Sequence, residues 1–393
     1  ILGAPQKGND VCTPATISNQ TTEVVTNFTS GPKPVVQVNA TCFKTAVPIL
    51  CLAALCSHCA ADDFENIAVV ADQEINDSSG LAISYENPDA IWVHNDSGDE
   101  ARLFLVGLDG VTQPVVDIPH IKAHDWEDVC SFQIDGESWL LIADVGDNSA
   151  KRGKGIPSFP ACQLYLLKEP VIPKSNGVTT TSVGVWSTIT FYYFEDGRPS
   201  RQYRPINCES VAVDVKERKI LLLTKTVPGK LYQLPLDTKA PRQKRWADKV
   251  AEIRMPPSEM PAFIEHAIKR RGVDVIAPTA MDISSDGRTM AICSTANGLV
   301  VHRTFDQTWA DAITRSRTAF QLPHSFLKTS FLPTSLVPPK QWEAICFDRT
   351  GKSIYLNCEG SGQPLWRANI PNVKAIAARN LEQKGIEVSF KDE

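Results

Sequence analysis

Short apolar segments separated by polar turns recur along this chain, spaced by roughly fifty to eighty residues. In four of five copies, a polar turn leads into a short apolar strand, and a turn containing Gly, Asp or Lys follows. A second strand rich in Ile, Leu and Val then ends at a polar tip. The copies begin near residues 75–77, 124–129, 207–209, 278–280 and 341–343. A repeated unit of β-strands that cannot bury its own faces is typical of radially stacked blades.

We therefore predict an all-β fold: a β-propeller of four-stranded blades, with five recognisable repeats and room for a sixth. The sixth blade would draw on residues 67–70 and 386–390. A simpler arrangement lets one terminal strand close the ring beside the other end of the chain, which removes exposed sheet edges. Residues 258–271 and 306–317 break the strand pattern. We predict that both are short helices in connections between blades.

The first 61 residues are predicted to be a leader outside the fold. Lys44, an apolar run over 46–55 and small residues at 59–61 follow the order of a secretory signal. The alternative is a disordered arm with a buried hydrophobic segment. The run is too short to span a bilayer, so no transmembrane helix is expected in the mature chain. Residues 62–393 are then one propeller domain, secreted or held in the periplasm or cell envelope.

Composition narrows the choice of partners. Of the 393 residues, 42% are hydrophobic and 22% charged, as in a globular protein with a real core. The formal net charge is -5, and no basic stripe with interleaved aromatics is present, so nucleic acid is not an expected partner. We expect a monomer with a small-molecule or glycan ligand. Six of the eleven cysteines follow the leader, and we expect mostly buried thiols, with room for one bridge.

Aligning the copies on their first strand gives one column of residues: Ser79, Glu127, Glu209, Thr279 and Glu343. The first strand of each blade lies nearest the axis, so this column is expected at the channel mouth. Like charges about 6 Å apart repel by roughly 3 kcal/mol at an effective dielectric of 20. A divalent cation, Lys225 or shared protons can neutralise them. The alternative is a structural network that binds loop amides.

The tips of the second strands give a second column: Asn95, Asp96, Asp144, Asp147, Asn148, Lys225, Ser294 and Glu359. Hard oxygen ligands from several loops suit Ca²⁺ or Mg²⁺. We therefore predict Ca²⁺ as cofactor, with metal ligands Asp144, Asp147, Glu343 and Glu359. Asn95, Asp96 and Lys225 are the candidate substrate-binding residues. For Asp147 and Asn148 the alternative is turn fixing by hydrogen bonds to backbone N–H groups.

Glu127, Glu209 and His124 are the candidate catalytic residues. His124 lies beside the first column, where an imidazole can act as a base or a metal ligand. The alternative for such a histidine is a packed, hydrogen-bonded residue. Trp126 and Trp342 precede equivalent glutamates, and we interpret both as blade-packing residues. The sequence has no GxSxG, HExxH or GxxxxGK[ST] motif, which disfavours serine hydrolase, zincin and P-loop chemistry.

Six motifs together resemble a family of secreted bacterial β-propellers: residues 95–99, 126–128, 144–148, 169–170, 208–210 and 342–344. Over roughly residues 66–370, the chain looks distantly like phytase-type propellers and the "esterase-like activity of phytase" group. The resemblance implies a propeller and an exported location. In phytase-like relatives, clustered acidic residues bind Ca²⁺ at the channel mouth. The residues of matching character here are Glu127, Asp144, Asp147, Glu209, Glu343 and Glu359.

The chain departs from that pattern in its fourth copy, where residues 294–297 carry no charge. Few basic residues lie at the tips, which disfavours phytase activity itself. Two hypotheses of function follow. One is a metal-assisted hydrolase of a phosphoester, lactone or other ester, in which the cation polarises the substrate. The other is a non-catalytic extracellular or envelope module that binds a carbohydrate, peptide or ion. The fold does not choose between them.

Overall fold

The computed structural model describes residues 64–148, 152, 161–173, 180–195, 198–199, 206–258, 260, 262–270, 272–323 and 341–370. The predicted leader lies outside these residues. No helix in the part described is long or apolar enough to cross a bilayer. The regular secondary structure of the described residues is almost all β-strand, as predicted.

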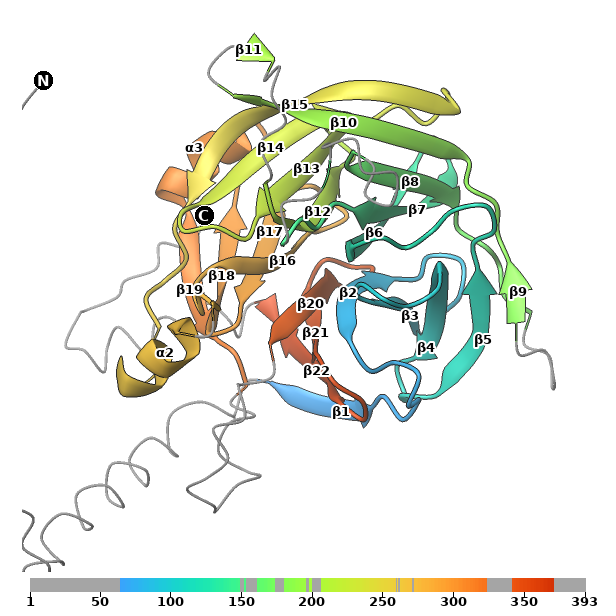
Figure 1. The fold of residues 1–393 in the computed structure, drawn as a ribbon, viewed down its shortest axis with the longest axis horizontal. Helices are drawn as coiled ribbons and strands as arrows, with labels where there is room; N and C mark the ends of the chain where they lie inside the picture. The colour runs from blue at the N-terminus through green and yellow to red at the C-terminus, as the bar shows by residue number, and fades with distance from the viewer. Residues whose placement is uncertain are drawn as a thin grey trace, which may run out of the picture. The chain divides into compact units, whose positions relative to one another are not determined.

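Five four-stranded blades make up the described fold (Figure 1). Blade 1 contains β2 (Ser78–Ile83), β3 (Ala90–Asn95), β4 (Arg102–Gly107) and β5 (Thr112–Asp117). Blade 2 contains β6 (Trp126–Ile134), β7 (Glu137–Asp144), β8 (Gln163–Lys168) and β10 (Ser187–Glu195). Blade 3 contains β12 (Cys208–Asp214), β13 (Lys219–Thr224), β14 (Gly229–Pro235) and β15 (Arg242–Ile253). Blade 4 contains β16 (Pro278–Ile283), β17 (Thr289–Ser294), β18 (Asn297–His302) and β19 (Arg317–Gln321).

Blade 5 closes the ring with strands from both ends of the described chain. It contains β20 (Trp342–Phe347), β21 (Ser353–Cys358), β22 (Pro364–Asn369) and β1 (Glu65–Val69). β1 pairs antiparallel with β22, so the N-terminal strand covers the outer edge of the last blade. The inner strands β2, β6, β12, β16 and β20 contact one another in that order, and β20 returns to β2. The propeller prediction is confirmed, and the described residues form five blades. Residues 386–390 lie outside them.

Two pairings on the outer side of the ring were not predicted from the sequence. β10 pairs in parallel with β15, which joins the outer strands of blades 2 and 3 into one sheet. The short strand β9 (Thr180–Ser182) pairs in parallel with β5 of blade 1. The two-residue strand β11 (Arg198–Pro199) pairs with β10. Such long-range pairings depend on which outer edges meet, and local sequence patterns do not encode that.

The two predicted helices are present, but one lies in a different place. Helix α2 (Ala262–Lys269) connects β15 to β16, between blades 3 and 4, as expected. Helix α3 (Trp309–Arg315) lies between β18 and β19, inside blade 4 and not between blades. The prediction failed here because β19 was not recognised as a strand. Thr308 and Asp311 form a capping box at the start of α3, and its buried face packs against β15.

Blade faces bury the core. The four fully buried tryptophans are Trp92, Trp126, Trp139 and Trp342, which confirms blade packing for the second and fourth. All six cysteines after the leader are buried and free of disulfides. The expectation of buried thiols is therefore confirmed for Cys130, Cys162, Cys208, Cys293, Cys346 and Cys358, and no bridge forms among them.

A β-bulge interrupts each inner strand at the same position. In β6, Trp126 pairs with Asp144 and Asp128 pairs with Ala143, which leaves Glu127 unpaired between them. The other inner strands skip one residue in the same way, at Ser79, Glu209, Thr279 and Glu343. A bulge re-aims its side chain and ends regular pairing. The five residues that the sequence aligned before the first strands are therefore the bulged residues of the five inner strands.

Candidate cation site at the channel mouth

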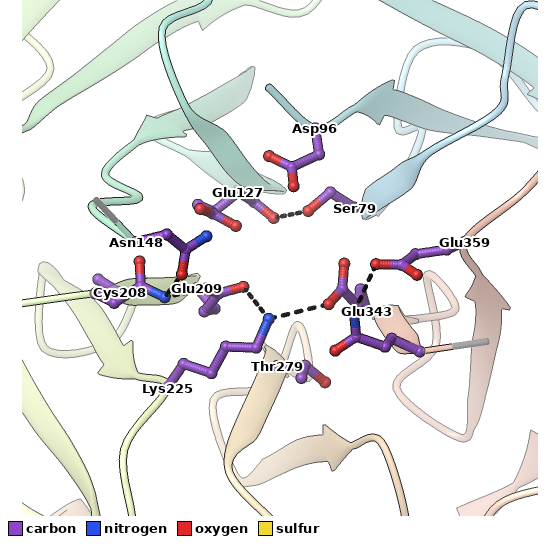
Figure 2. A network of polar contacts seen from close by, with 12 residues as sticks. Ser79, Asp96, Glu127, Asn148, Cys208, Glu209, Lys225, Thr279, Glu343 and Glu359 are labelled. Carbon is purple, nitrogen blue, oxygen red and sulfur yellow. Dashed lines mark hydrogen bonds and ion pairs between the residues drawn. The ribbon is translucent and has the colours of Figure 1, made fainter. Parts of the chain in front are cut away.

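The bulged glutamates of three blades face one another at one end of the channel (Figure 2). Lys225, which follows β13, lies between two of them. Its Nζ is 3.0 Å from Glu209 Oε2 and 3.1 Å from Glu343 Oε1. The Lys225 side chain is 20% exposed, and those of Glu209 and Glu343 are almost fully buried. The structure thus brings together the three glutamates that the sequence aligned, and Lys225 pairs with two of them.

The charge of Lys225 is stabilised by its neighbours. Burial alone would lower its pKa, but Glu209, Glu343 and Glu127 outweigh burial and raise it. Lys225 is therefore protonated at neutral pH. One lysine cannot balance all the carboxylates around it. Glu359 accepts a hydrogen bond of 3.0 Å from the Gln341 amide. Burial, and then the neighbouring Glu343, raise the pKa of Glu359 to about 8.

Glu127 lies on the side of the mouth away from Lys225 and is 1% exposed. Its Oε1 is buried and has no hydrogen-bond partner. Burial raises its pKa well above the usual range, and the charges of Glu209 and Asp96 raise it further. A buried carboxylate oxygen without a donor is costly. This oxygen therefore requires either a proton or a cation.

Asp96 and Asp125 complete a compact oxygen cluster with Glu127. One carboxylate oxygen from each of the three lies within 4.8 Å of the others. Burial raises the pKa of Asp96 to about 7 and that of Asp125 to about 6, and neighbouring carboxylates add to the increase. Three carboxylates without nitrogen or sulfur donors suit a hard cation such as Ca²⁺ or Mg²⁺. The donor set and the unpartnered oxygen of Glu127 both fit such an ion.

Asp125 was not among the residues chosen from the sequence. It comes two residues before Glu127, in the bend that leads into β6. That spacing was the available signal. It was missed because Asp125 precedes the strand and belongs to neither aligned column.

Gly146 makes room for the cluster. A methyl group on its Cα would overlap Glu127 Oε1 and press against the Asp125 carboxylate. A side chain at this position would force these carboxylates to move, because of their close approach and not because of the backbone angles of Gly146. The loop after β7 thus packs directly against the bulge of β6.

Asp144 lies beside this cluster but has other partners. Its buried carboxylate binds the buried guanidinium of Arg152 and accepts a hydrogen bond from Asp125 N (3.1 Å). His124 Nδ1 lies 3.0 Å from Asp144 Oδ2. Burial would raise the pKa of Asp144, but His124 and Arg152 lower it overall. The structure thus places Asp144 behind His124, where it orients the imidazole, and not with Asp96, Asp125 and Glu127.

Asp147 and Asn95, two further candidates, hold the loops around the mouth by hydrogen bonds. Asp147 Oδ1 accepts from Arg152 N (3.1 Å), and Asp147 N donates to the Asn207 side chain (2.8 Å). These contacts match the turn-fixing alternative. Asn95 is 6% exposed and accepts from the backbone of Asn76 and Asp77. Asn95 Nδ2 also donates within blade 1, so this side chain supports the rim.

Comparisons with known proteins give weak likenesses. No family model matches the chain, and no curated protein sequence matches it. A gluconolactonase from Xanthomonas campestris is 10% identical, covering 74% of this chain and 71% of that one, with a TM-score of 0.35. A chain of a nidogen/laminin complex is 10% identical (72% and 73% covered, TM-score 0.36). A PQQ-bound aldose sugar dehydrogenase from Streptomyces coelicolor is 12% identical (78% and 97% covered, TM-score 0.36). The propeller assignment rests on strand order and ring closure.

Proposed function

We propose that the channel mouth binds one Ca²⁺ ion through Asp96, Asp125 and Glu127, and that the protein is a metal-assisted hydrolase of an ester or lactone. The observation that carries the proposal is the buried Oε1 of Glu127, which has no hydrogen-bond partner, on a carboxylate that clusters with those of Asp96 and Asp125. The oxygen-only donor set favours Ca²⁺ over Zn²⁺. Glu343 and Glu359, predicted as metal ligands, belong in this proposal to the neighbouring half of the mouth, with Lys225 and Glu209.

A bound cation would polarise a substrate carbonyl and lower the pKa of a water molecule. His124 is the proposed general base. Asp144 holds its Nδ1, so the other ring nitrogen remains available to accept a proton. Arg152 in turn fixes Asp144. Lys225, with three N–H donors of which two face Glu209 and Glu343, can donate the third to a substrate oxygen.

Calcium binding is the first test. Protein stripped with EDTA is titrated with Ca²⁺ by calorimetry. We expect one site, and we expect Glu127→Gln to weaken it at least about tenfold, because a charged ligand is lost. Glu137→Gln, at an exposed hairpin, is the matched control and keeps normal affinity. Equal affinity in the Glu127→Gln and wild-type proteins would contradict the proposed ligand set.

Hydrolysis is tested separately with chromogenic esters and lactones, with and without EDTA. We expect turnover that EDTA abolishes and Ca²⁺ restores, with His124→Gln losing activity but keeping Ca²⁺. Tight Ca²⁺ binding without turnover on any substrate would instead support the non-catalytic binding module. The expected export of the mature chain rests on residues 44–61, and N-terminal sequencing of secreted protein tests it.

A further inference from the structure

A groove on blade 1 opens beside the proposed cation site. Its volume is about 370 Å³, within the range of small-molecule sites, which is about 300–1,000 Å³. Glu74, Asp77, Asn95, Asp96, Asp99 and Arg102 are among the residues that line it. Asp96 therefore belongs both to the groove and to the carboxylate cluster. A ligand in this groove would lie next to the cation.

Hydrogen bonds of the Asn95 side chain hold the two walls of the groove together. Asn95 accepts from Asn76 N and Asp77 N, both at 3.1 Å, and donates to Glu74 O (2.8 Å) and Asp99 Oδ2 (2.7 Å). This one buried side chain ties the segment before β2 to the tip after β3. These internal bonds hold the two walls together without a ligand, which limits the ordering that a ligand would have to impose.

The charges in the groove discriminate between substrate classes. Its cation, Arg102, is already paired with Glu74 (2.5 Å) and Asp99 (2.9 Å). Lys225, across the mouth, is paired with Glu209 and Glu343. In contrast, the Asp77 carboxylate makes no hydrogen bond or ion pair to the described residues. Three carboxylates against one divalent ion leave this site net negative even with the cation bound, and Asp77 adds a fourth carboxylate. An anionic ligand would therefore meet excess negative charge.

We propose that the ligand of this groove is a neutral polyhydroxylated compound, of the sugar or sugar-lactone class, and not a phosphoester. The inference rests on the proposed function, because it assigns the substrate class of the same site. Hydroxyl groups donate to Asp77 and Asp96, and a hydroxyl or carbonyl oxygen reaches the cation. An ammonium group is disfavoured at the cation because it has no lone pair with which to coordinate the ion.

The test uses hexoses that differ by one charged group. Ca²⁺-loaded protein is titrated by calorimetry with glucose, glucose 6-phosphate and glucosamine, and with the matching mannose and galactose series. We expect at least one neutral hexose to bind about tenfold or more tightly than its phosphate and its amine. Tightest binding by a phosphate or an amine, or no preference for any neutral hexose, overturns the inference.

Variants separate this result from the cation proposal. Asp77→Asn keeps the shape of the wall but removes a charged acceptor. We expect it to weaken hexose binding about tenfold while Ca²⁺ affinity changes less than about threefold. Glu137→Gln is the control and changes neither. Normal hexose binding by Asp77→Asn overturns the inference and leaves the cation site standing. Absence of Ca²⁺ binding by the wild-type protein overturns the proposed function, and the substrate class that depends on it is then rejected as well.

Discussion

Glu127 is held in an environment that its own charge opposes. It is almost completely buried, its neighbours are acidic, and its Oε1 has no donor. Lys225 balances Glu209 and Glu343 but lies on the other side of the mouth. Buried groups whose pKa values are shifted by desolvation and charged neighbours cluster at functional sites. This environment supports the proposed role of Glu127 as a cation ligand, held at some cost in stability.

Gly146→Ala tests whether the close approach of Gly146 shapes the cluster. The added methyl group would overlap the Glu127 carboxylate, which must then move from its place beside Asp125. We expect Ca²⁺ affinity to fall at least about tenfold, a loss on the order of 1.4 kcal/mol. Calorimetric titration measures it. Gly184→Ala, between β9 and β10, is the control, because Gly184 has open space around it and no left-handed backbone angle. Unchanged Ca²⁺ affinity in Gly146→Ala would show that the carboxylates do not need this gap.

At the scale of elements, the inner strands share two devices. The bulge turns one side chain of each blade toward the mouth. Aspartate side chains then accept hydrogen bonds from the unpaired backbone edge of the next blade. Asp128 Oδ2 accepts from Val211 N of blade 3 (2.8 Å), and Asp282 Oδ2 accepts from Phe347 N of blade 5 (2.8 Å). Inner strands have no sheet neighbour on their axial side, so these carboxylates satisfy backbone groups that would otherwise be orphaned.

Asp128→Ala should therefore destabilise the protein without touching the cation site. Asp128 also accepts from Val129 N (2.8 Å), so the change leaves two buried amides without this acceptor. Each orphaned amide costs about 1–3 kcal/mol, and we expect a loss on the order of 2–5 kcal/mol in the free energy of unfolding. Urea denaturation measures it, with Asp117→Ala, at an exposed position of β5, as control. A loss no greater than that of the control would refute the blade-linking role.

At the scale of the whole molecule, closing the ring concentrates acidic side chains at one end. Glu343, which is distant from Asp96 along the chain, raises the pKa of Asp96 there. The pKa values of Asp96, Asp125 and Glu359 are about 7, 6 and 8, above the usual range near 4 for carboxyl groups. The mouth is therefore a single electrostatic unit that only the closed ring creates.

Stability of the Ca²⁺-free protein should fall as pH rises from 5 to 8. In this window the folded state binds more protons than the unfolded state, because its carboxyl pKa values are raised, so deprotonation costs folding free energy. Ca²⁺ bound to the deprotonated carboxylates would offset this loss of stability. A concentration one hundred times Kd adds about 2.7 kcal/mol, and at a fixed Ca²⁺ concentration the gain is larger at pH 8 than at pH 5.

Thermal melts in EDTA and in Ca²⁺ at both pH values measure this effect. In Glu127→Gln, which carries no charge at that position, we expect the gap between the EDTA and Ca²⁺ melting temperatures to shrink at pH 8. A gap that is equal at the two pH values, or larger at pH 5, would contradict the proposed competition between protons and the cation.

The sequence by itself determined the repeat, the propeller and the alignment of Glu127, Glu209 and Glu343. These follow from local information, because alternation of apolar residues and turn chemistry set each hairpin, and five similar units must stack to bury their faces. It also allowed ring closure by the N-terminal strand, which β1 performs.

Only the tertiary structure decided which carboxylates meet. Asp125 joins Asp96 and Glu127, while Arg152 and His124 hold Asp144 beside the cluster. The placement of α3 within blade 4 and the parallel pairing of β10 with β15 were decided in the same way. These contacts join residues from different loops and blades, and their energies depend on burial and on neighbouring charge. Neither quantity exists until the ring closes.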